Sequence, residues 1–239
     1  MPRRRPKVSV IVPAAGSGSR LGGSVKKQFI KLENKPVLIH TLQRFEHCTD
    51  VDEIAVAIPE EFIVEMEKLV SQYRLHKVRR VVIGGTKRQD SVFNALNKLA
   101  LKDSDIVLVH DGVRPFIESK RISQLVKACR THDAVVLAIQ PKDTVRRSNG
   151  GRFFDQTLDR SALWLVQTPQ VFKAGILLKA FAKARKDKFY STDEVALVER
   201  LGVKAKIIEG SYDNIKITTK EDLELGSLIL ERWNEKGTA

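Results

Sequence analysis

The sequence is poor in cysteine and aromatic residues, and it has no long apolar run. Its two cysteines, Cys48 and Cys129, match no metal-binding spacing, so we expect reduced core thiols in a cytoplasmic protein. Aromatic residues make up 6% and are not interleaved with the basic runs, which argues against a nucleic-acid-binding module. No stretch approaches the ~20 apolar residues of a membrane span, so we expect no membrane partner.

The N-terminus is basic, but its sequence does not predict a signal peptide. The apolar run behind it, Val8 to Val12, is short and leads into a glycine-rich loop rather than a cleavage site. The net charge of +13 and the pI of about 9.8 favour an anionic partner such as a nucleotide or a phosphorylated metabolite, with a basic solvated surface as the alternative. The length of 239 residues suits one large α/β domain or two small ones. With no repeat or linker in the sequence, we predict a single domain over residues 1–239.

Strand and helix patterns alternate along most of the chain, which predicts a Rossmann-like α/β fold. Its mostly parallel sheet carries helices on both faces. Expected strands cover 8–12, 53–58, 78–83, 106–109, 134–139 and 204–208, with an extended stretch at 214–218. Expected helices cover 36–45, 60–73, 90–101, 121–131, 173–185 and 219–233, and Ser191 to Glu194 matches a capping box that opens another helix. Ligands of such sheets bind beyond the carboxyl ends of the strands.

Small residues follow the first strand, in the segment PAAGSGSR. Ala14, Ala15, Gly16 and Gly18 allow close approach of backbone N–H groups to an anion, and Arg20 and Lys27 lie shortly beyond. The segment is neither a P-loop nor a complete GxGxxG motif. A flexible strand–helix turn is the alternative to a phosphate loop.

Two further motifs follow later strands. GGTKRQDSV, residues 84–92, combines a glycine pair with a residue that could cap or polarise the next helix. In HDGVRP, residues 110–115, Asp111 suits Mg²⁺ and Arg114 suits a phosphate, although a structural Asp–Arg pair is the alternative. His110 is expected to be a packed strand-end residue.

The alternation breaks at residues 141–163. Asn149-Gly150 is a strong hairpin signal, and Phe153 and Phe154 would be poorly covered on a lone hairpin. An exposed apolar patch of this kind usually marks an interface. We therefore predict a protruding arm that forms a homodimer and completes the partner's site, with a hairpin folded back on its own sheet as the alternative.

Together the motifs identify a resemblance to a known family. PAAGSGSR with Lys27-Gln28, GGxxRxxSV, HDGVRP, the pairs DT and DR, then TPQ, STDE and DNIKIT occur in this order. They resemble the 2-C-methyl-D-erythritol 4-phosphate cytidylyltransferases of the non-mevalonate isoprenoid pathway, over Val8 to about Leu230. The resemblance implies a nucleotidyltransferase that moves CMP from CTP onto the methylerythritol phosphate and releases pyrophosphate.

The resemblance also implies a role for each matching residue. Catalytic roles fall to Arg20, Lys27, Arg160 and Lys216; CTP contacts to Ala14, Ala15, Gly16, Gly18, Gly85, Arg88 and Ser91; Mg²⁺ to Asp111; and substrate contacts to Arg114, Thr144, Thr168 and Thr192. Two other functions stay open at this point. One is a ribitol 5-phosphate cytidylyltransferase, and the other is a basic nucleic-acid-binding module.

Overall fold

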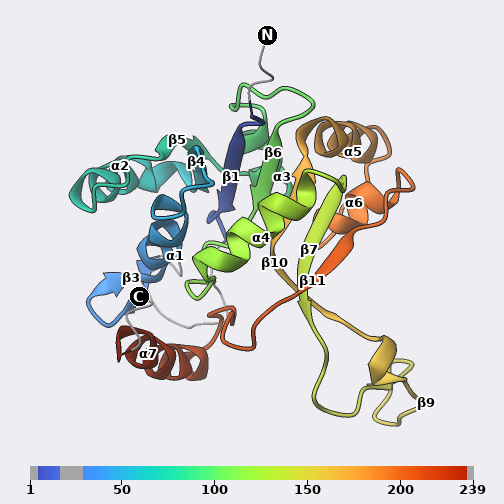
Figure 1. Ribbon diagram of the computed structural model, residues 1–239. Coiled ribbons are helices and arrows are strands. Elements are labelled where there is room, and N and C mark those ends of the chain that lie inside the picture. The colour runs from blue at the N-terminus through green and yellow to red at the C-terminus, as the bar shows by residue number, and fades with distance from the viewer. Residues whose placement is uncertain (1–4, 17–28, 236–239) are drawn as a thin grey trace.

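A central sheet of seven strands organises the protein, whose computed structural model describes residues 5–16 and 29–235 (Figure 1). Its strands are β1 (Val8–Pro13), β4 (Glu53–Ile58), β5 (Val78–Ile83), β6 (Ile106–Val109), β7 (Ala134–Ile139), β10 (Leu165–Lys173) and β11 (Lys206–Glu209), in the order β11-β7-β10-β6-β1-β4-β5. Strands such as VSVIVP and EIAVAI are mostly apolar and β-branched or small, as expected where both faces of a sheet are covered.

Within this seven-stranded sheet the strand pairs are parallel except those of β10, which runs antiparallel to both β6 and β7. This confirms the predicted mostly parallel sheet. The patterns did not predict β10, because Pro169 interrupts its sequence and proline is disfavoured in a central strand. Here the register shifts between Val166 and Gln170, so Pro169 falls where the pairing with β7 is interrupted.

Helices cover both faces of the sheet, and the side chains of the strands alternate between them. On one face α1 (Val37–Glu46), α2 (Ile63–Gln72) and α4 (Ser119–Cys129) pack on Val10 and Leu108. On the other face α3 (Arg88–Leu96), α5 (Ala174–Lys186) and α6 (Val195–Glu199) pack on Ile11 and Val107. Neighbouring residues of one strand thus face different cores, which is the two-residue period of a β-strand.

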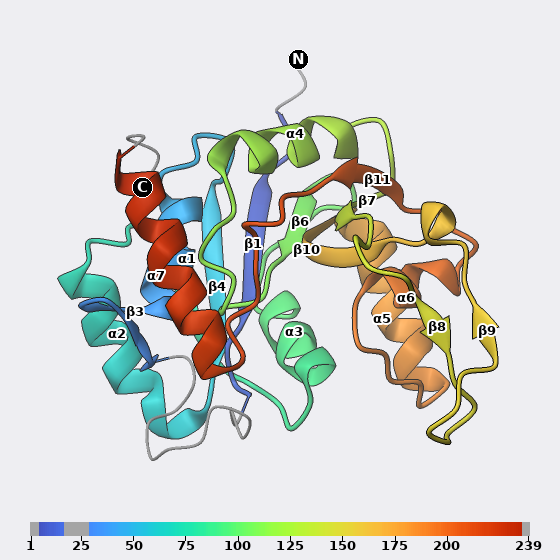
Figure 2. The ribbon, with the colours of Figure 1, turned by 90° about the horizontal axis from the view of Figure 1, so that it is seen from below.

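The C-terminal helix α7 (Lys220–Glu235) builds a third, smaller core. It lies beside the paired strands β2 (Lys31–Leu32) and β3 (Lys35–Pro36) (Figure 2). The helix packs with Leu32 of β2, and its Trp233 meets Phe116 edge-on. Thr219 caps the helix as predicted, because its hydroxyl accepts the backbone N–H of Asp222. None of the helices within 5–16 and 29–235 combines the length and the apolarity that a membrane crossing requires.

The arm predicted at residues 141–163 projects from the lower end of the sheet in Figure 1. It contains a short antiparallel pair, β8 (Arg146–Arg147) with β9 (Gln156–Thr157), followed by a 3₁₀ turn, η4 (Arg160–Ala162). The hairpin is confirmed, but residues 148–155 form a longer connection than a two-residue Asn-Gly turn. Phe153 and Phe154 are 87% and 68% exposed, so this chain alone leaves them uncovered.

Several predicted boundaries differ from the observed ones. The helix predicted over residues 90–101 is α3, which already begins at Arg88 and ends at Leu96. The helix predicted from residue 60 opens with a 3₁₀ turn, η3 (Glu60–Phe62), before α2. Residues 214–218 lie outside the sheet, where the backbone N–H of Ile217 donates to Val113 O.

Candidate active site

Three loops meet at the carboxyl edge of the sheet, beyond β1, β5 and β6. A Cβ built on Gly84 would lie 2.3 Å from the Cβ of Ala15, and one built on Gly112 would lie 3.2 Å from the Cβ of Ala14. The described part of the small-residue loop therefore packs directly against the two other loops. Gly16 follows it and is exposed. Gly18, Arg20 and Lys27 lie outside the described residues.

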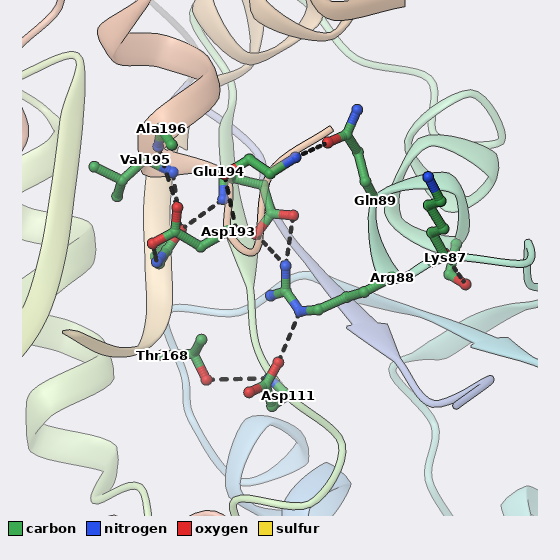
Figure 3. A network of polar contacts seen from close by, with 12 residues as sticks. Lys87, Arg88, Gln89, Asp111, Thr168, Asp193, Glu194, Val195 and Ala196 are labelled. Carbon is green, nitrogen blue, oxygen red and sulfur yellow. Dashed lines mark hydrogen bonds and ion pairs between the residues drawn. The ribbon is translucent and has the colours of Figure 1, made fainter. Parts of the chain in front are cut away.

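Asp111 lies at the centre of a cluster of cations. Its Oδ1 accepts Arg88 Nε at 2.9 Å, its Oδ2 lies 2.8 Å from Lys216 Nζ, and Arg114 Nε is 3.6 Å from the same oxygen. Figure 3 shows Arg88 reaching Asp111 from α3. The Asp–Arg pair considered from the sequence is thus present, but two more cations from distant segments share the same carboxylate.

Burial and the neighbouring cations together determine the protonation state of Asp111. Burial alone would raise the pKa of the Asp111 carboxyl, but Arg88, Lys216 and Arg114 together hold that pKa well below its ordinary range. Asp111 is therefore ionised at any physiological pH. The site offers a fixed carboxylate surrounded by excess positive charge, which is suited to a polyanionic ligand.

Hydrogen bonds made by the residues next to Lys216 hold its segment in place. Asn214 is buried, and its side-chain Nδ2 donates to the backbone oxygen of Thr168 at 2.9 Å. The backbone oxygen of Asn214 accepts Arg114 Nη1 at 2.7 Å. Ile217 N–H bonds to Val113 O. These contacts tie residues 214–217 to β10 and to the loop after β6, so that Lys216 reaches Asp111 without belonging to a strand.

Thr168 and His110 form the inner wall of this site. The Thr168 hydroxyl accepts the backbone N–H of Asp111 at 3.1 Å and lies 3.1 Å from His110 Nδ1. His110 Nε2 lies 2.9 Å from Arg114 O. Burial lowers the pKa of His110 to about 4, so its ring is neutral. His110 is therefore a packed strand-end residue, as predicted.

Ser91 joins α3 to the glycine pair after β5. Its hydroxyl accepts Gly85 N–H at 3.0 Å and lies 3.2 Å from Lys87 O. A Cβ on Gly85 would lie 2.3 Å from that of Asp90, so the loop is tightly folded against the helix N-terminus. Ser91 is 2% exposed, and its observed role is to hold this loop in place.

Comparisons with known proteins agree with this geometry. Residues 8–232 match the family model of 2-C-methyl-D-erythritol 4-phosphate cytidylyltransferase. The chain belongs to this family. Proteins of that name from Syntrophus aciditrophicus and Alkaliphilus metalliredigens are 42% and 44% identical over 95% of this chain and 97% and 94% of their own lengths.

A solved structure supports the same assignment. The 4-diphosphocytidyl-2C-methyl-D-erythritol synthase of Anaerococcus prevotii superposes with a TM-score of 0.82, at 31% identity, over 95% of this chain and 97% of that one. The predicted family, fold and enzyme class are therefore confirmed: the chain is a cytidylyltransferase.

Other residues that the family resemblance marked lie apart from the Asp111 cluster. Thr144 is exposed on the arm, and Arg160, also on the arm, donates from Nη1 to Lys142 O at 2.7 Å. Thr192 is exposed before α6. Within residues 5–16 and 29–235, no hydrogen bond or ion pair joins any of these three to Asp111.

Sequence reasoning missed Glu194, which it took for part of a capping box. That prediction is wrong: α6 begins after Glu194, whose side chain makes no capping bond and instead binds Arg88 Nη1 through both oxygens, at 2.7 and 2.9 Å. Asp193 Oδ1 accepts Ala196 N–H instead. Because the partner is 106 positions away, only the acidic pair in STDE could have drawn attention to this residue.

Proposed function

We propose that the chain transfers the cytidylyl group of CTP to 2-C-methyl-D-erythritol 4-phosphate. A phosphate oxygen of the acceptor attacks the α-phosphorus of CTP, the bond to the β-phosphate breaks, and pyrophosphate leaves with the electron pair. The observation that carries the proposal is the carboxylate of Asp111 held among three cations, at the sheet edge where the small-residue loop begins.

Cations rather than a general base suit this reaction. The attacking phosphate is already ionised near neutral pH, so the barrier is the approach of two polyanions and the charge that builds on the phosphoryl oxygens. We assign stabilisation of that charge to Arg20 and Lys27, which lie outside the described residues. Lys216, and Arg160 from the arm of a partner, position the acceptor phosphate.

The nucleotide lies, in this proposal, along the loops after β1 and β5. Its contacts are Ala14, Ala15, Gly16, Gly18, Gly85, Arg88 and Ser91. The close packing of Gly84 against Ala15 supports a shared surface, since a Cβ at Gly84 would push the two loops apart. Arg88 stands at the start of α3, where the helix N-terminus also favours an anion.

We propose Asp111 as the protein ligand of Mg²⁺. The described residues contain no cluster of three or more His, Cys, Asp or Glu side chains that could enclose a metal. A single ionised carboxylate fits this ion nevertheless, because Mg²⁺ is commonly held by one or two carboxylates together with substrate phosphates. When bound there, the ion supplies charge neutralisation to the triphosphate.

The acceptor is assigned to Arg114, Thr144, Thr168 and Thr192. Because Thr144 and Arg160 lie on the projecting arm, we propose a homodimer in which each arm completes the neighbour's site. The exposure of Phe153 and Phe154 supports this, since a two-fold contact would cover them. We also propose that residues 1–239 form one domain that includes the arm, and that the enzyme acts in the cytoplasm.

Pyrophosphate release tests the proposed reaction. The enzyme is supplied with CTP, Mg²⁺ and either 2-C-methyl-D-erythritol 4-phosphate or ribitol 5-phosphate. We expect release with the first acceptor only. Preference for ribitol 5-phosphate would establish the alternative substrate, and no release with either would overturn the assignment.

A further inference from the structure

Arg88 connects two buried carboxylates that belong to different parts of the fold. Its Nε donates to Asp111, and its Nη1 donates to both oxygens of Glu194, whose side chain is 1% exposed (Figure 3). The two carboxylates hold the pKa of Arg88 above its ordinary value although burial opposes this. The guanidinium is thus charged and restrained from two sides.

Glu194 is itself held rigidly. The side-chain oxygen of Gln170, on β10, accepts the backbone N–H groups of Glu194 and Val195 at 3.0 and 3.1 Å, and its amide donates to Asp193 at 2.9 Å. Gln170 is 1% exposed. A buried amide with this many partners is a precise anchor, because each lost bond would leave a buried polar group unpaired.

The first turn of α3 grips the same segment from the other side. Gln89 donates to Phe189 O at 3.0 Å and accepts Ser191 N–H at 2.9 Å, and Asp90 accepts the Tyr190 hydroxyl at 3.2 Å. Residues 189–194 therefore form one surface with the helix that carries Arg88. A carboxylate fixed in this way can determine where the guanidinium points.

We propose that Glu194 is a positioning residue for CTP. It acts through Arg88, holding the guanidinium so that Asp111 receives the Nε–H and Glu194 receives Nη1. Nη2, which has no hydrogen-bond partner among the described residues, then faces the nucleotide. This inference rests on the proposed CTP site. Without the Glu194 charge, Arg88 can turn to form a two-pronged pair with Asp111, which is the geometry that guanidinium and carboxylate prefer. Arg88 would then be withdrawn from the nucleotide.

The sign of the effect separates this role from simple electrostatics. Neutralising Glu194 leaves three cations with one carboxylate, so an effect of charge alone would make an anionic ligand bind more tightly. A positioning role predicts the opposite. One lost charge-assisted hydrogen bond corresponds to roughly tenfold in affinity.

The test uses Glu194→Gln and isothermal titration with CTP and Mg²⁺, without the acceptor so that no turnover occurs. We expect CTP to bind about tenfold more weakly, while KM for the acceptor is unchanged. The matched control is Asp105→Asn. Asp105 is 6% exposed and accepts the N–H groups of Lys7 and Lys102 before β6, at the opposite end of the strand from Asp111. Asp105→Asn should lower the free energy of unfolding without changing the affinity for CTP.

A second pair of variants tests whether Glu194 acts through Arg88, even where Glu194→Gln alone folds poorly. Arg88→Met and the double variant Arg88→Met/Glu194→Gln should bind CTP equally, because the guanidinium to be positioned is gone in both. Equal or tighter CTP binding by Glu194→Gln, or an additive loss in the double variant, overturns the positioning role. Failure of the wild-type enzyme to bind CTP would instead overturn the proposed function, and the inference with it.

Discussion

Replacing Asp111 by asparagine removes the negative charge that three cations share and keeps the shape of the side chain. Arg88, Lys216 and Arg114 approach this carboxylate to 2.9, 2.8 and 3.6 Å. The amide can still accept a hydrogen bond, but it no longer balances the charges. The variant therefore isolates the electrostatic contribution of this residue.

The expected loss of stability follows from burial. The Asp111 side chain is 9% exposed, and removing one partner of a buried ion pair costs about 3–5 kcal/mol. Lys216 is 37% exposed and can turn towards solvent, which reduces the cost. We therefore expect the free energy of unfolding to fall by about 3 kcal/mol.

Two measurements check this reasoning. Urea unfolding at neutral pH gives the loss of stability, and titration with CTP at several Mg²⁺ concentrations should show that the metal no longer strengthens CTP binding. Asp187→Asn is the control, because Asp187 pairs with Arg200 and Lys183 at the surface and its loss should change little. A stability loss below about 1 kcal/mol, together with unchanged metal dependence, would show that Asp111 behaves as a surface charge and would refute the argument.

Acid adds an independent check with a defined sign. The folded protein holds the pKa of Asp111 below its ordinary value of 3.8, so its stabilising contribution is complete above that pH and is lost as the pH falls further. The wild-type protein should therefore lose stability more steeply below pH 3.8 than Asp111→Asn does. Parallel curves would contradict the depressed pKa.

Four further predictions follow from other parts of the chain. Lys27→Ala should lower kcat by roughly 10²–10³ with little change in urea unfolding, and near-normal turnover would remove its assigned role. Mixed dimers of inactive Lys27→Ala and Arg160→Ala should regain activity after subunit exchange, whereas verified exchange without recovery would mean that each chain builds its own site. Gly84→Ala should weaken CTP binding, because the new Cβ would lie 2.3 Å from that of Ala15 and must push the two loops apart; unchanged CTP affinity in a titration would contradict this. His40 has a pKa lowered to about 4, mainly by burial, so unfolding free energy should fall as pH drops from 6.5 to about 4, and less so in His40→Gln, as urea unfolding across this range would show.

The prediction for Gly84→Ala has its own control variant, Gly175→Ala. Gly175 lies at the start of α5, away from the site. A Cβ on Gly175 would lie 2.8 Å from Asp103 Cγ. Gly175→Ala should therefore disturb packing to a similar degree and leave CTP binding intact. If both glycine variants weaken CTP binding equally, the effect is general destabilisation.

Features with a local cause could be predicted from the amino-acid sequence alone. Alternating runs of apolar strand residues and amphipathic helices specify the parallel sheet, because each pattern fits one backbone period. Three other features are likewise recognisable from a short stretch of sequence: the small residues after β1, the cap at Thr219 and the hairpin around Asn149-Gly150. The position of Asp111 after a strand was sufficient to suggest a site, since parallel strands end at one edge.

How distant segments share the site depends on the folded structure. β10 lies between β6 and β7 although Pro169 argues against a central strand, because a register shift accommodates it. Lys216 and Arg88 converge on Asp111 from segments that no local pattern relates, and Glu194 pairs with Arg88 rather than capping its own helix. These contacts balance buried charges across the fold, and the energy of a buried charge depends on which groups the whole chain brings near it.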